Sequence, residues 1–175
     1  MNALYLILGS ESALADRALT KLNAQLKDEN AEITTLFAAD TIVGDIADAL
    51  APSLFSERRA LIIRDLQDLP EDNRDEITRY IGQPDPTTTV IFVHKGGVKG
   101  KALLDAIKKA QPEIIACDPL KKEAEKEEFA KSLFLDLGRQ MKHLNIFIYQ
   151  IQFHQIYLFN RNYFVLCIYF HINII

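Results

Sequence analysis

The sequence predicts an α/β domain of three layers, with a mainly parallel five-stranded sheet between two layers of helices and an unrelated C-terminal tail. Short apolar segments alternate with segments of helical spacing as far as about residue 138. Strands separated by helices must be joined by crossover connections, and such connections make neighbouring strands parallel. The character of the chain changes after Met141. We therefore expect a folded body over 1–141 and a tail over 142–175.

The five predicted strands are short runs that are rich in apolar, β-branched and aromatic residues. The clearest of them is "TTTVIFVHK" at 87–95, where Val, Ile, Phe and Thr favour an extended backbone. The other four are "LYLILG" at 4–9, "EITTLFAAD" at 32–40, "RRALIIRDL" at 58–66 and "PEIIACDPL" at 112–120.

The first two helices are predicted from apolar spacing. Steps of four, three and four residues place one apolar stripe on the first helix, formed by Ala15, Leu19, Leu22 and Leu26. Asp40 is a suitable N-cap for a second helix over Thr41–Leu50. This assignment places Ile42, Ile46 and Leu50 together on its buried face.

Three further helices follow the third, fourth and fifth strands. One is predicted over Leu69–Ile81, entered through Pro70, because proline is tolerated in the first helical turn. The next covers Lys101–Ala110. The last covers Lys121–Gly138, and its buried face is expected to begin at Phe129.

Charge and cysteine content restrict the class of protein. The body to Gly138 holds 17 basic and 24 acidic residues, a net charge of −7, which is unfavourable for a surface that binds nucleic acid over its whole extent. Cys117 and Cys167 lack the spacing of a metal site. We therefore expect no metal, a reducing compartment and, because "MNALYLILGSES" lacks a basic leader region, a cytoplasmic location without a membrane anchor.

The tail differs from the body in composition. Residues 143–175 contain no Gly, Ala, Pro, Ser, Thr, Asp or Glu, so they lack both turn residues and acidic charge. Their longest uninterrupted apolar run, Tyr163–Phe170, is far shorter than the about 20 residues of a membrane span. We interpret 142–175 as an atypical segment, of the kind that a reading-frame shift produces, which was not selected to fold with the body.

The first glycine-containing turn fails as a phosphate-binding loop. Such a loop needs a second glycine, a lysine and a hydroxyl residue at set distances from the first glycine. Counting from Gly9, these three places hold Leu14, Ala15 and Asp16. An aspartate would also repel phosphate, so we expect no nucleotide there.

A second glycine-containing turn, "HKGGVKGKALLDAI" at 94–107, leaves two interpretations open. From Gly96 to Gly100 the spacing is one residue too short for a phosphate-binding loop, and Ala102 stands where a hydroxyl is required. The turn either attracts an anion or DNA at the entrance of the helix or is a glycine turn with solvated lysines. The lysines concerned are Lys95, Lys99 and Lys101.

No catalytic set can be assembled from the remaining polar residues. Asp65 and Asp68 follow the third strand, but their spacing is typical of a solvated strand end. His94 ends an apolar strand and is interpreted as structural. We predict neither an active site nor a cofactor.

The apolar pair Leu54–Phe55 stands in a connection instead of an element. Pro52 disfavours helical angles at residue 51 and lacks an amide hydrogen, so the helical register stops before the pair. Spacing alone leaves burial in the core and exposure equally open. An exposed pair between polar residues would mark a binding site for a partner.

Several stretches together resemble the delta subunit of bacterial DNA polymerase III, especially its actinobacterial branch. "SLF" at 53–55, behind a helix that ends in proline, is similar to the segment with which that family contacts the sliding clamp. The resemblance covers about residues 1–141 and no single motif carries it alone. The other stretches are "YLILGSESALADRAL" at 5–19, "VHKGGVKGKALLDAI" at 93–107 and "CDPLKKEAEKEEFAKSLF" at 117–134.

The resemblance implies an AAA+-like domain with a degenerate P-loop that binds no ATP. It also implies that Ser53, Leu54 and Phe55 bind the sliding clamp and help to open it for loading onto primed DNA during replication. By this resemblance, the protein is a subunit of a DNA-directed DNA polymerase holoenzyme, which is a nucleotidyltransferase. We see no active site in the subunit itself.

The same resemblance bears on partners. The family implies partnership with other clamp-loader subunits and an indirect contact with primer–template DNA. Its lid and collar domains have no counterpart in 142–175, so we expect binding to the clamp without assembly into the loader. The alternative from another class is a P-loop-like nucleotide-binding enzyme or regulator that uses Gly96–Lys101.

Overall fold

A computed structural model describes residues 1–52 and 56–136 of the chain. The chain divides into two compact units, Met1–Met141 and Lys142–Ile175, and the described residues all belong to the first. The predicted tail lies outside the described residues.

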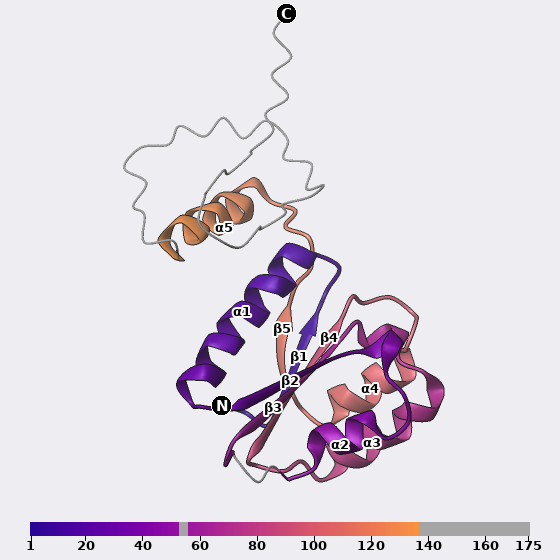
Figure 1. The fold of residues 1–175 in the computed structure, drawn as a ribbon. Coiled ribbons are helices and arrows are strands. Elements are labelled where there is room, and N and C mark those ends of the chain that lie inside the picture. Colours follow the sequence, from indigo (N-terminus) through magenta and orange to yellow (C-terminus); the bar gives the residue numbers. More distant parts are fainter. Residues whose placement is uncertain (53–55, 137–175) are drawn as a thin grey trace, which may run out of the picture. The chain divides into compact units, whose positions relative to one another are not determined.

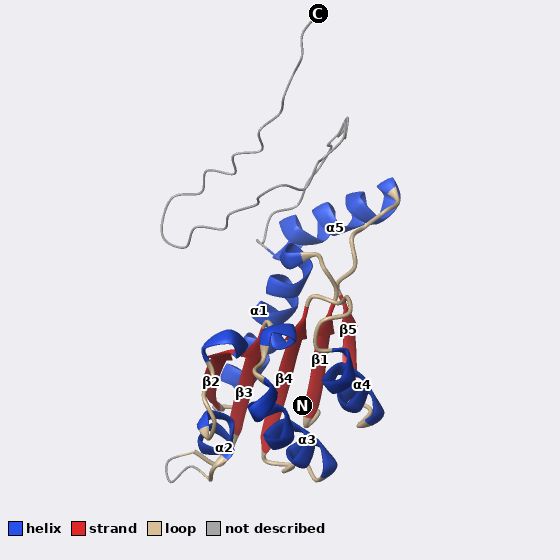
Figure 2. Cartoon of the chain, turned by 90° about the vertical axis from the view of Figure 1, so that its right-hand side faces the viewer, coloured by secondary structure: helices blue, strands red, loops and turns tan. Residues whose placement is uncertain are grey.

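The described part of the first unit contains one parallel sheet in the order β2-β3-β4-β1-β5. Figure 2 shows the five strands side by side in this order. The predicted fold class is therefore confirmed. The strands are β1 (Leu4–Leu8), β2 (Glu32–Phe37), β3 (Arg59–Arg64), β4 (Thr88–His94) and β5 (Glu113–Ala116).

Helices cover both faces of the sheet (Figure 1). On one face lies α1 (Ser12–Asp28), whose Leu19, Leu22 and Leu26 are buried, as the spacing predicts. On the other face lie three helices, which contribute Ile46, Ile77 and Leu103 among others to the second half of the core. These three helices are α2 (Asp45–Leu50), α3 (Arg74–Gly82) and α4 (Lys101–Lys109).

The alternation of side chains along the strands explains why two separate cores form. In β1, Leu4 and Leu6 join the core under α2, α3 and α4, whereas Tyr5 and Ile7 join the core under α1. All seven residues of β4 are buried because the strand lies between two neighbours and under both layers. Burial of a large apolar side chain such as Phe92, which is 0% exposed, contributes about 1.5–3 kcal/mol.

The second helix begins later than its spacing predicts. Asp40 ends a short 3-10 helix, η1 (Ala38–Asp40), and α2 starts only at Asp45, after Gly44 in the left-handed conformation with φ +100°. Ile42 is 69% exposed instead of buried. The predicted cap at Asp40 and the buried position of Ile42 were therefore wrong.

A residue from another helix explains the late start of α2. The carboxylate of Glu76 in α3 accepts hydrogen bonds from the amides of Gly44 at 3.0 Å and Ala47 at 3.1 Å. An acidic group at this end of a helix also interacts favourably with the helix dipole. This contact depends on tertiary structure, so the local spacing could not reveal it.

The third helix is also shorter than predicted. Residues Leu66–Asp68 and Glu71–Asn73 form two 3-10 turns, η2 and η3, before α3 begins at Arg74. The last described helix, α5 (Glu123–Asp136), ends where the description of the chain ends. Its Phe129 is half-buried, and the guanidinium of Arg17 in α1 lies 5.1 Å from the ring centre of Phe129.

Candidate functional site

The carboxyl edge of the sheet is where an open parallel sheet of this kind usually binds its ligand. The turn from β1 to α1 crosses this edge, and two of its amides bond to the protein itself. Gly9 donates to the carbonyl of His94 at 3.1 Å, and Glu11 donates to the carbonyl of Cys117 at 2.9 Å. These two amides are therefore not available to cradle a phosphate.

A glycine is needed at position 9 because the turn passes close to the backbone of Cys117. The φ of Gly9 is +149°, and a Cβ built on it would lie 2.1 Å from the carbonyl carbon of Cys117. Cys117 itself is buried, and desolvation raises the pKa of its thiol. The turn therefore has the position of a phosphate-binding loop but is closed against the end of β5.

Two ion pairs occupy the next part of the same edge. The ammonium of Lys95 lies 2.8 Å from Asp65, and that of Lys99 lies 2.5 Å from Asp68. The hydrogen bond from Lys95 lowers the pKa of Asp65, and the one from Lys99 lowers the pKa of Asp68. The buried amide of Gln67 donates toward both carboxylates and accepts from the backbone amide of Lys95 at 3.2 Å.

His94 organises the turn that carries these lysines. The side chain is 1% exposed. Its Nδ1 accepts a hydrogen bond from the amide of Gly96 at 2.8 Å, so its Nε2 is left to donate to the carbonyl of Lys99 at 3.1 Å. Burial lowers the pKa of His94, which keeps the ring neutral and both bonds intact. Both ring nitrogens of His94 are thus bonded to the backbone of the turn, which fits its interpretation as a structural residue.

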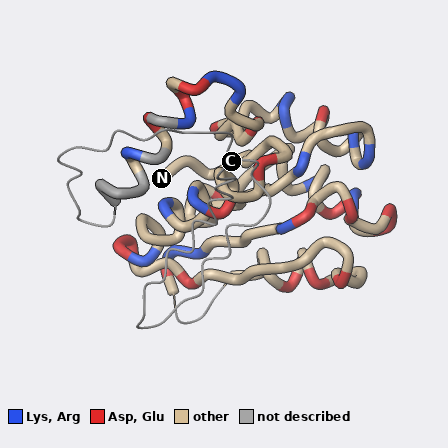
Figure 3. The backbone as a smooth tube through the Cα atoms, turned by 90° about the horizontal axis from the view of Figure 1, so that it is seen from above, with Lys and Arg blue, Asp and Glu red and all other residues tan. Residues whose placement is uncertain are grey.

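The three lysines of the predicted anion or DNA contact lie at this edge, but two of them contact carboxylates. Lys95 and Lys99 are paired as described, and Lys101 is an exposed residue at the start of α4. Basic and acidic positions alternate along the described backbone and do not form one continuous basic stretch (Figure 3). Contact of these lysines with DNA stays a prediction. The ion pairs with Asp65 and Asp68 do not favour it, because they already engage two of the three lysines.

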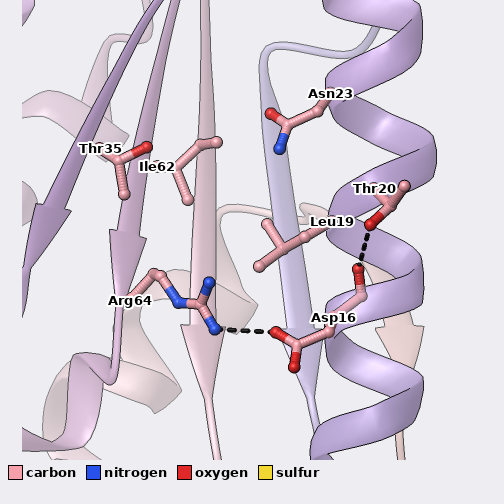
Figure 4. A pocket seen from close by; sticks show the side chains of 7 residues that line it. All are labelled: Asp16, Leu19, Thr20, Asn23, Thr35, Ile62 and Arg64. Atoms are coloured by element: carbon pink, nitrogen blue, oxygen red, sulfur yellow. Dashed lines mark hydrogen bonds and ion pairs between the residues drawn. The ribbon is translucent and has the colours of Figure 1, made fainter. Parts of the chain in front are cut away.

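A small cavity lies between α1 and strands β2 and β3. It has a volume of about 160 Å³. Pockets for drug-sized ligands have volumes of about 300–1,000 Å³, so this cavity is too small for a nucleotide. The residues that line it are Asp16, Leu19, Thr20, Asn23, Thr35, Ile62 and Arg64 (Figure 4).

Contacts within the protein occupy part of this cavity. The guanidinium of Arg64 in β3 lies 2.8 Å from the carboxylate of Asp16 in α1 (Figure 4). This ion pair joins the strand to the helix. Thr20 donates to the backbone carbonyl of Asp16 at 2.8 Å. Asn23 Oδ1 is buried without a hydrogen-bond partner within the part of the chain that the structure describes. One unpartnered acceptor in a small cavity gives no basis for a ligand class.

The opposite, amino edge of the sheet carries the connection from α2 to β3. The predicted clamp-binding residues Ser53, Leu54 and Phe55 belong to this connection and lie outside the described residues. Their burial therefore stays a prediction. The helix α2 ends at Leu50, and Ala51 already has extended angles, φ −64° and ψ 145°. The helical register stops before Pro52, as the sequence predicts.

The connection re-enters the sheet at two adjacent arginines with different surroundings. The side chain of Arg58 is 50% exposed and pairs with Glu29 at 2.9 Å. The side chain of Arg59 is 10% exposed and donates to the backbone carbonyl of Ala51 and to Thr88 Oγ1. The sequence prediction did not include Arg59. The available signal was an arginine directly before the four apolar residues Ala60–Ile63 of a strand.

The described residues give no sign of a membrane span or a metal centre. No helix among residues 1–52 and 56–136 combines the length and apolar character that crossing a bilayer requires. Within the same ranges, no three His, Cys, Asp or Glu residues gather as a metal-binding group.

The strand order and the two helical layers define an α/β fold of the AAA+-like, P-loop-like kind (Figure 1). A family model described as "DNA polymerase III, delta subunit" matches residues 5–118. The chain belongs to this family.

Solved structures share the fold at low sequence identity. The DNA clamp loader delta protein of Bacillus subtilis aligns with a TM-score of 0.61 and 19% identity, covering 78% of this chain and 44% of that one. A variant of Thermotoga maritima RuvB aligns with a TM-score of 0.51 and 14% identity, covering 78% of this chain and 44% of that one. No curated protein matches this chain at the level of sequence. The chain therefore spans less than half the length of these two structures, and at such identities the likeness concerns the fold.

Proposed function

We propose that the chain acts as the clamp-binding domain of a clamp-loader delta subunit during DNA replication in the cytoplasm. In this function Leu54 and Phe55 enter an apolar pocket of the sliding clamp, and Ser53 shapes the turn before them. The observation that carries the proposal is the family match over residues 5–118, which includes this connection. One solved structure with the same fold, from Bacillus subtilis, is itself named a DNA clamp loader delta protein.

The closed carboxyl edge supports an interaction module over a nucleotide-binding enzyme. The amides of Gly9 and Glu11 bond to backbone carbonyls, and the amide of Gly96 bonds to His94. Lys95 and Lys99 already contact carboxylates. A nucleotide at Gly96–Lys101 would have to displace these contacts, so no described observation favours that alternative.

The energetics of two apolar anchors fit a partner site. Burial of a Leu or a Phe side chain is worth about 1.5–3 kcal/mol each, and every 1.4 kcal/mol changes affinity tenfold. Removal of both side chains is therefore expected to weaken clamp binding by at least about 100-fold.

The proposed role in clamp opening is a population shift. A protein that binds the open clamp more tightly than the closed clamp moves the equilibrium toward the open form. We expect the chain to bind a clamp variant with a weakened ring interface more tightly than the closed wild-type ring. Equal affinity for the two clamps would leave binding in place but remove the opening role. Contact with other loader subunits, and indirectly with primer–template DNA, belongs to the same proposal.

The test of the proposed function is a binding measurement on the full chain. Biolayer interferometry with immobilised sliding clamp compares the wild type with the double variant Leu54→Ala, Phe55→Ala. We expect loss of binding together with an unchanged melting temperature, because an exposed pair contributes little to the fold. Wild-type affinity in the double variant would refute the site. A large fall in melting temperature would instead assign the pair to the core.

A further inference from the structure

Two neighbouring apolar side chains point outward from the loop between η1 and α2. Ile42 is 69% exposed and Val43 is 65% exposed, whereas Thr41 directly before them is 5% exposed. The late start of α2 at Asp45 takes Ile42 off the buried helical face that its spacing predicts. Single exposed apolar residues are common, but an adjacent pair among polar residues is the kind of patch that marks an interaction site.

The loop that carries the pair is held in place by side chains from several elements. The side-chain amide of Asn73, a residue that is 1% exposed, donates to the carbonyl of Ile42 at 2.7 Å. The amide of Ile42 donates to the carboxylate of Asp45 at 2.9 Å, and the hydroxyl of Thr41 donates to a backbone carbonyl four residues earlier at 2.9 Å. Glu76 accepts from two amides on the other side of the pair. The backbone is therefore bonded both before and after the pair.

This rigid presentation reduces the entropy that binding has to remove. Isoleucine and valine are branched at Cβ, so Ile42 and Val43 have few rotamers to lose. Their backbone is already bonded in one conformation, and ordering of loops and side chains is a main cost of association. The fold thus holds two apolar groups toward solvent in a form that is prepared for a partner.

The segments around the pair carry most of the negative charge of the folded body. Residues 40–48 and 71–76 contact each other through Asn73 and Glu76. Together they hold seven acidic residues and one arginine, a net charge of −6, against −7 for the whole body to Gly138. The arginine, Arg74, pairs with Glu71 at 3.2 Å. The acidic residues are Asp40, Asp45, Asp48, Glu71, Asp72, Asp75 and Glu76.

The charge selects the kind of partner. Phosphates of nucleic acids and anionic lipid headgroups are repelled by an acidic surface, and two copies of the same acidic patch repel each other. A basic surface is attracted to it. We propose that Ile42 and Val43, with the acidic residues of 40–48 and 71–76, form a docking surface for a protein segment that has apolar side chains on one face and Lys or Arg beside them.

This inference goes beyond the proposed function. It concerns residues that the structure describes, and neither Leu54 nor Phe55 belongs to the docking surface. A patch of this size favours a weak, transient contact. The variant Leu54→Ala, Phe55→Ala should therefore keep this second interaction, so failure of the clamp proposal would leave it standing.

The experiment uses two synthetic peptides as probes on the isotope-labelled full chain. One peptide has Leu on one helical face and Lys on the other, and the second has Glu in place of every Lys. We expect the Lys peptide to shift the amide signals of 40–48 and 71–76 and to bind more weakly as salt is added. The Glu peptide should not bind. Shifts confined to other residues, or equal binding of both peptides, would overturn the inference.

A pair of matched variants tests the apolar contact. Ile42→Thr, Val43→Thr keeps the branching at Cβ and should weaken binding of the Lys peptide at least about tenfold, with an unchanged melting temperature because both side chains are exposed. Val98→Thr is the control, since Val98 is 85% exposed but lies in the turn with Lys95 and Lys99, and it should stay within about twofold of the wild type.

The outcomes of these variants decide between occupants. Wild-type affinity in the double variant, or an equal loss in Val98→Thr, would refute the docking surface. Sedimentation that depends on concentration in the wild type and not in the double variant would assign the pair to a second copy of the chain, which overturns the basic partner. Should the double variant not fold, Ile42→Thr alone replaces it, and wild-type affinity in that variant would equally refute the surface.

Discussion

The two edges of the same sheet carry opposite kinds of structure. At the carboxyl edge, where the P-loop class binds its nucleotide, the amide of Gly9 bonds to His94 and the carboxylate of Asp65 pairs with Lys95. At the amino edge, the connection between α2 and β3 leaves the helix at Ala51 and returns at Arg59, which bonds the two ends together. At the first edge polar groups pair within the protein, and at the second Arg59 bonds to the residue that follows α2.

The difference fits the proposed use of this fold as an interaction domain. Parallel strands and crossover helices set both edges at once, so closing one edge leaves the scaffold unchanged. We place the proposed function at the amino edge because the family match covers it and because the Gly96 amide and the Lys99 ammonium at the carboxyl edge are already paired.

The largest effect is expected from a side chain at Gly9. Gly9→Ala should lower the free energy of unfolding by more than about 3 kcal/mol, since its Cβ would lie 2.1 Å from backbone atoms of Cys117. Gly97→Ala is the control at the same edge. Gly97 also has positive φ, +86°, but open space around it, and its replacement should cost only about 1 kcal/mol. Urea denaturation measures both, and equal losses would show that the carboxyl edge is not closed by this contact.

A smaller effect is expected from the protonation of His94. Burial lowers its pKa in the folded protein below the ordinary 6.5, so the unfolded state binds the proton more readily. Stability from the neutral ring is complete above pH 6.5 and is lost as the pH falls from there through the lowered pKa. Lys108 lowers this pKa further, whereas Asp68 and the carbonyl of Lys99 oppose the shift.

Thermal melts between pH 7.5 and 5, values chosen about one unit or more on either side of the ordinary histidine pKa, measure this effect. Stability of the wild type should fall across the range, and His94→Gln should show a shallower fall. Asp65 and Asp68 do not contribute to the change in this pH range. Their pKa values are lowered in the folded protein, so the stability that they contribute is lost only below pH 3.8. Parallel pH profiles for the two proteins would show that His94 does not carry the dependence.

The smallest effect is expected from the ion pair between Asp65 and Lys95. Both side chains are partly exposed, 34% and 64%, and such pairs typically contribute about 0.2–1 kcal/mol. A double-mutant cycle with Asp65→Asn and Lys95→Gln should give a coupling in this range that decreases with salt. None of the variants should acquire ATP binding in a calorimetric titration, since the amides of Gly9 and Glu11 stay bonded to backbone carbonyls. ATP binding by Asp65→Asn would break the contrast between the two edges.

The sequence revealed the layers of the fold more readily than the ends of its helices. Alternating strand and helix patterns predicted the order of elements, and the failed count from Gly9 predicted a degenerate phosphate loop. The start of α2 could not be predicted because Glu76, distant in sequence, bonds the amides of Gly44 and Ala47. Local periodicity therefore favoured a helix that included Ile42, which is exposed in the structure.

The candidate site shows the same limit. Pro52 indicated from sequence that Leu54 and Phe55 leave the helical register, and resemblance supplied a role for them. Nothing in the spacing distinguished Arg58 from Arg59. Their difference, an exposed pair with Glu29 against a buried contact with Ala51, exists only once the ends of α1 and α2 lie beside the start of β3. The pairing of Lys95 and Lys99 with Asp65 and Asp68 likewise needs two strand ends side by side.

The central claim is that this chain binds its partner at the amino edge of the sheet while the carboxyl edge stays closed. Hydrogen exchange of the full chain with and without sliding clamp tests it most directly. We predict protection of the amides at 53–59 on adding clamp, and unchanged exchange at 9–15 and 94–101. Protection at 9–15 or 94–101 with unchanged exchange at 53–59 would contradict the account.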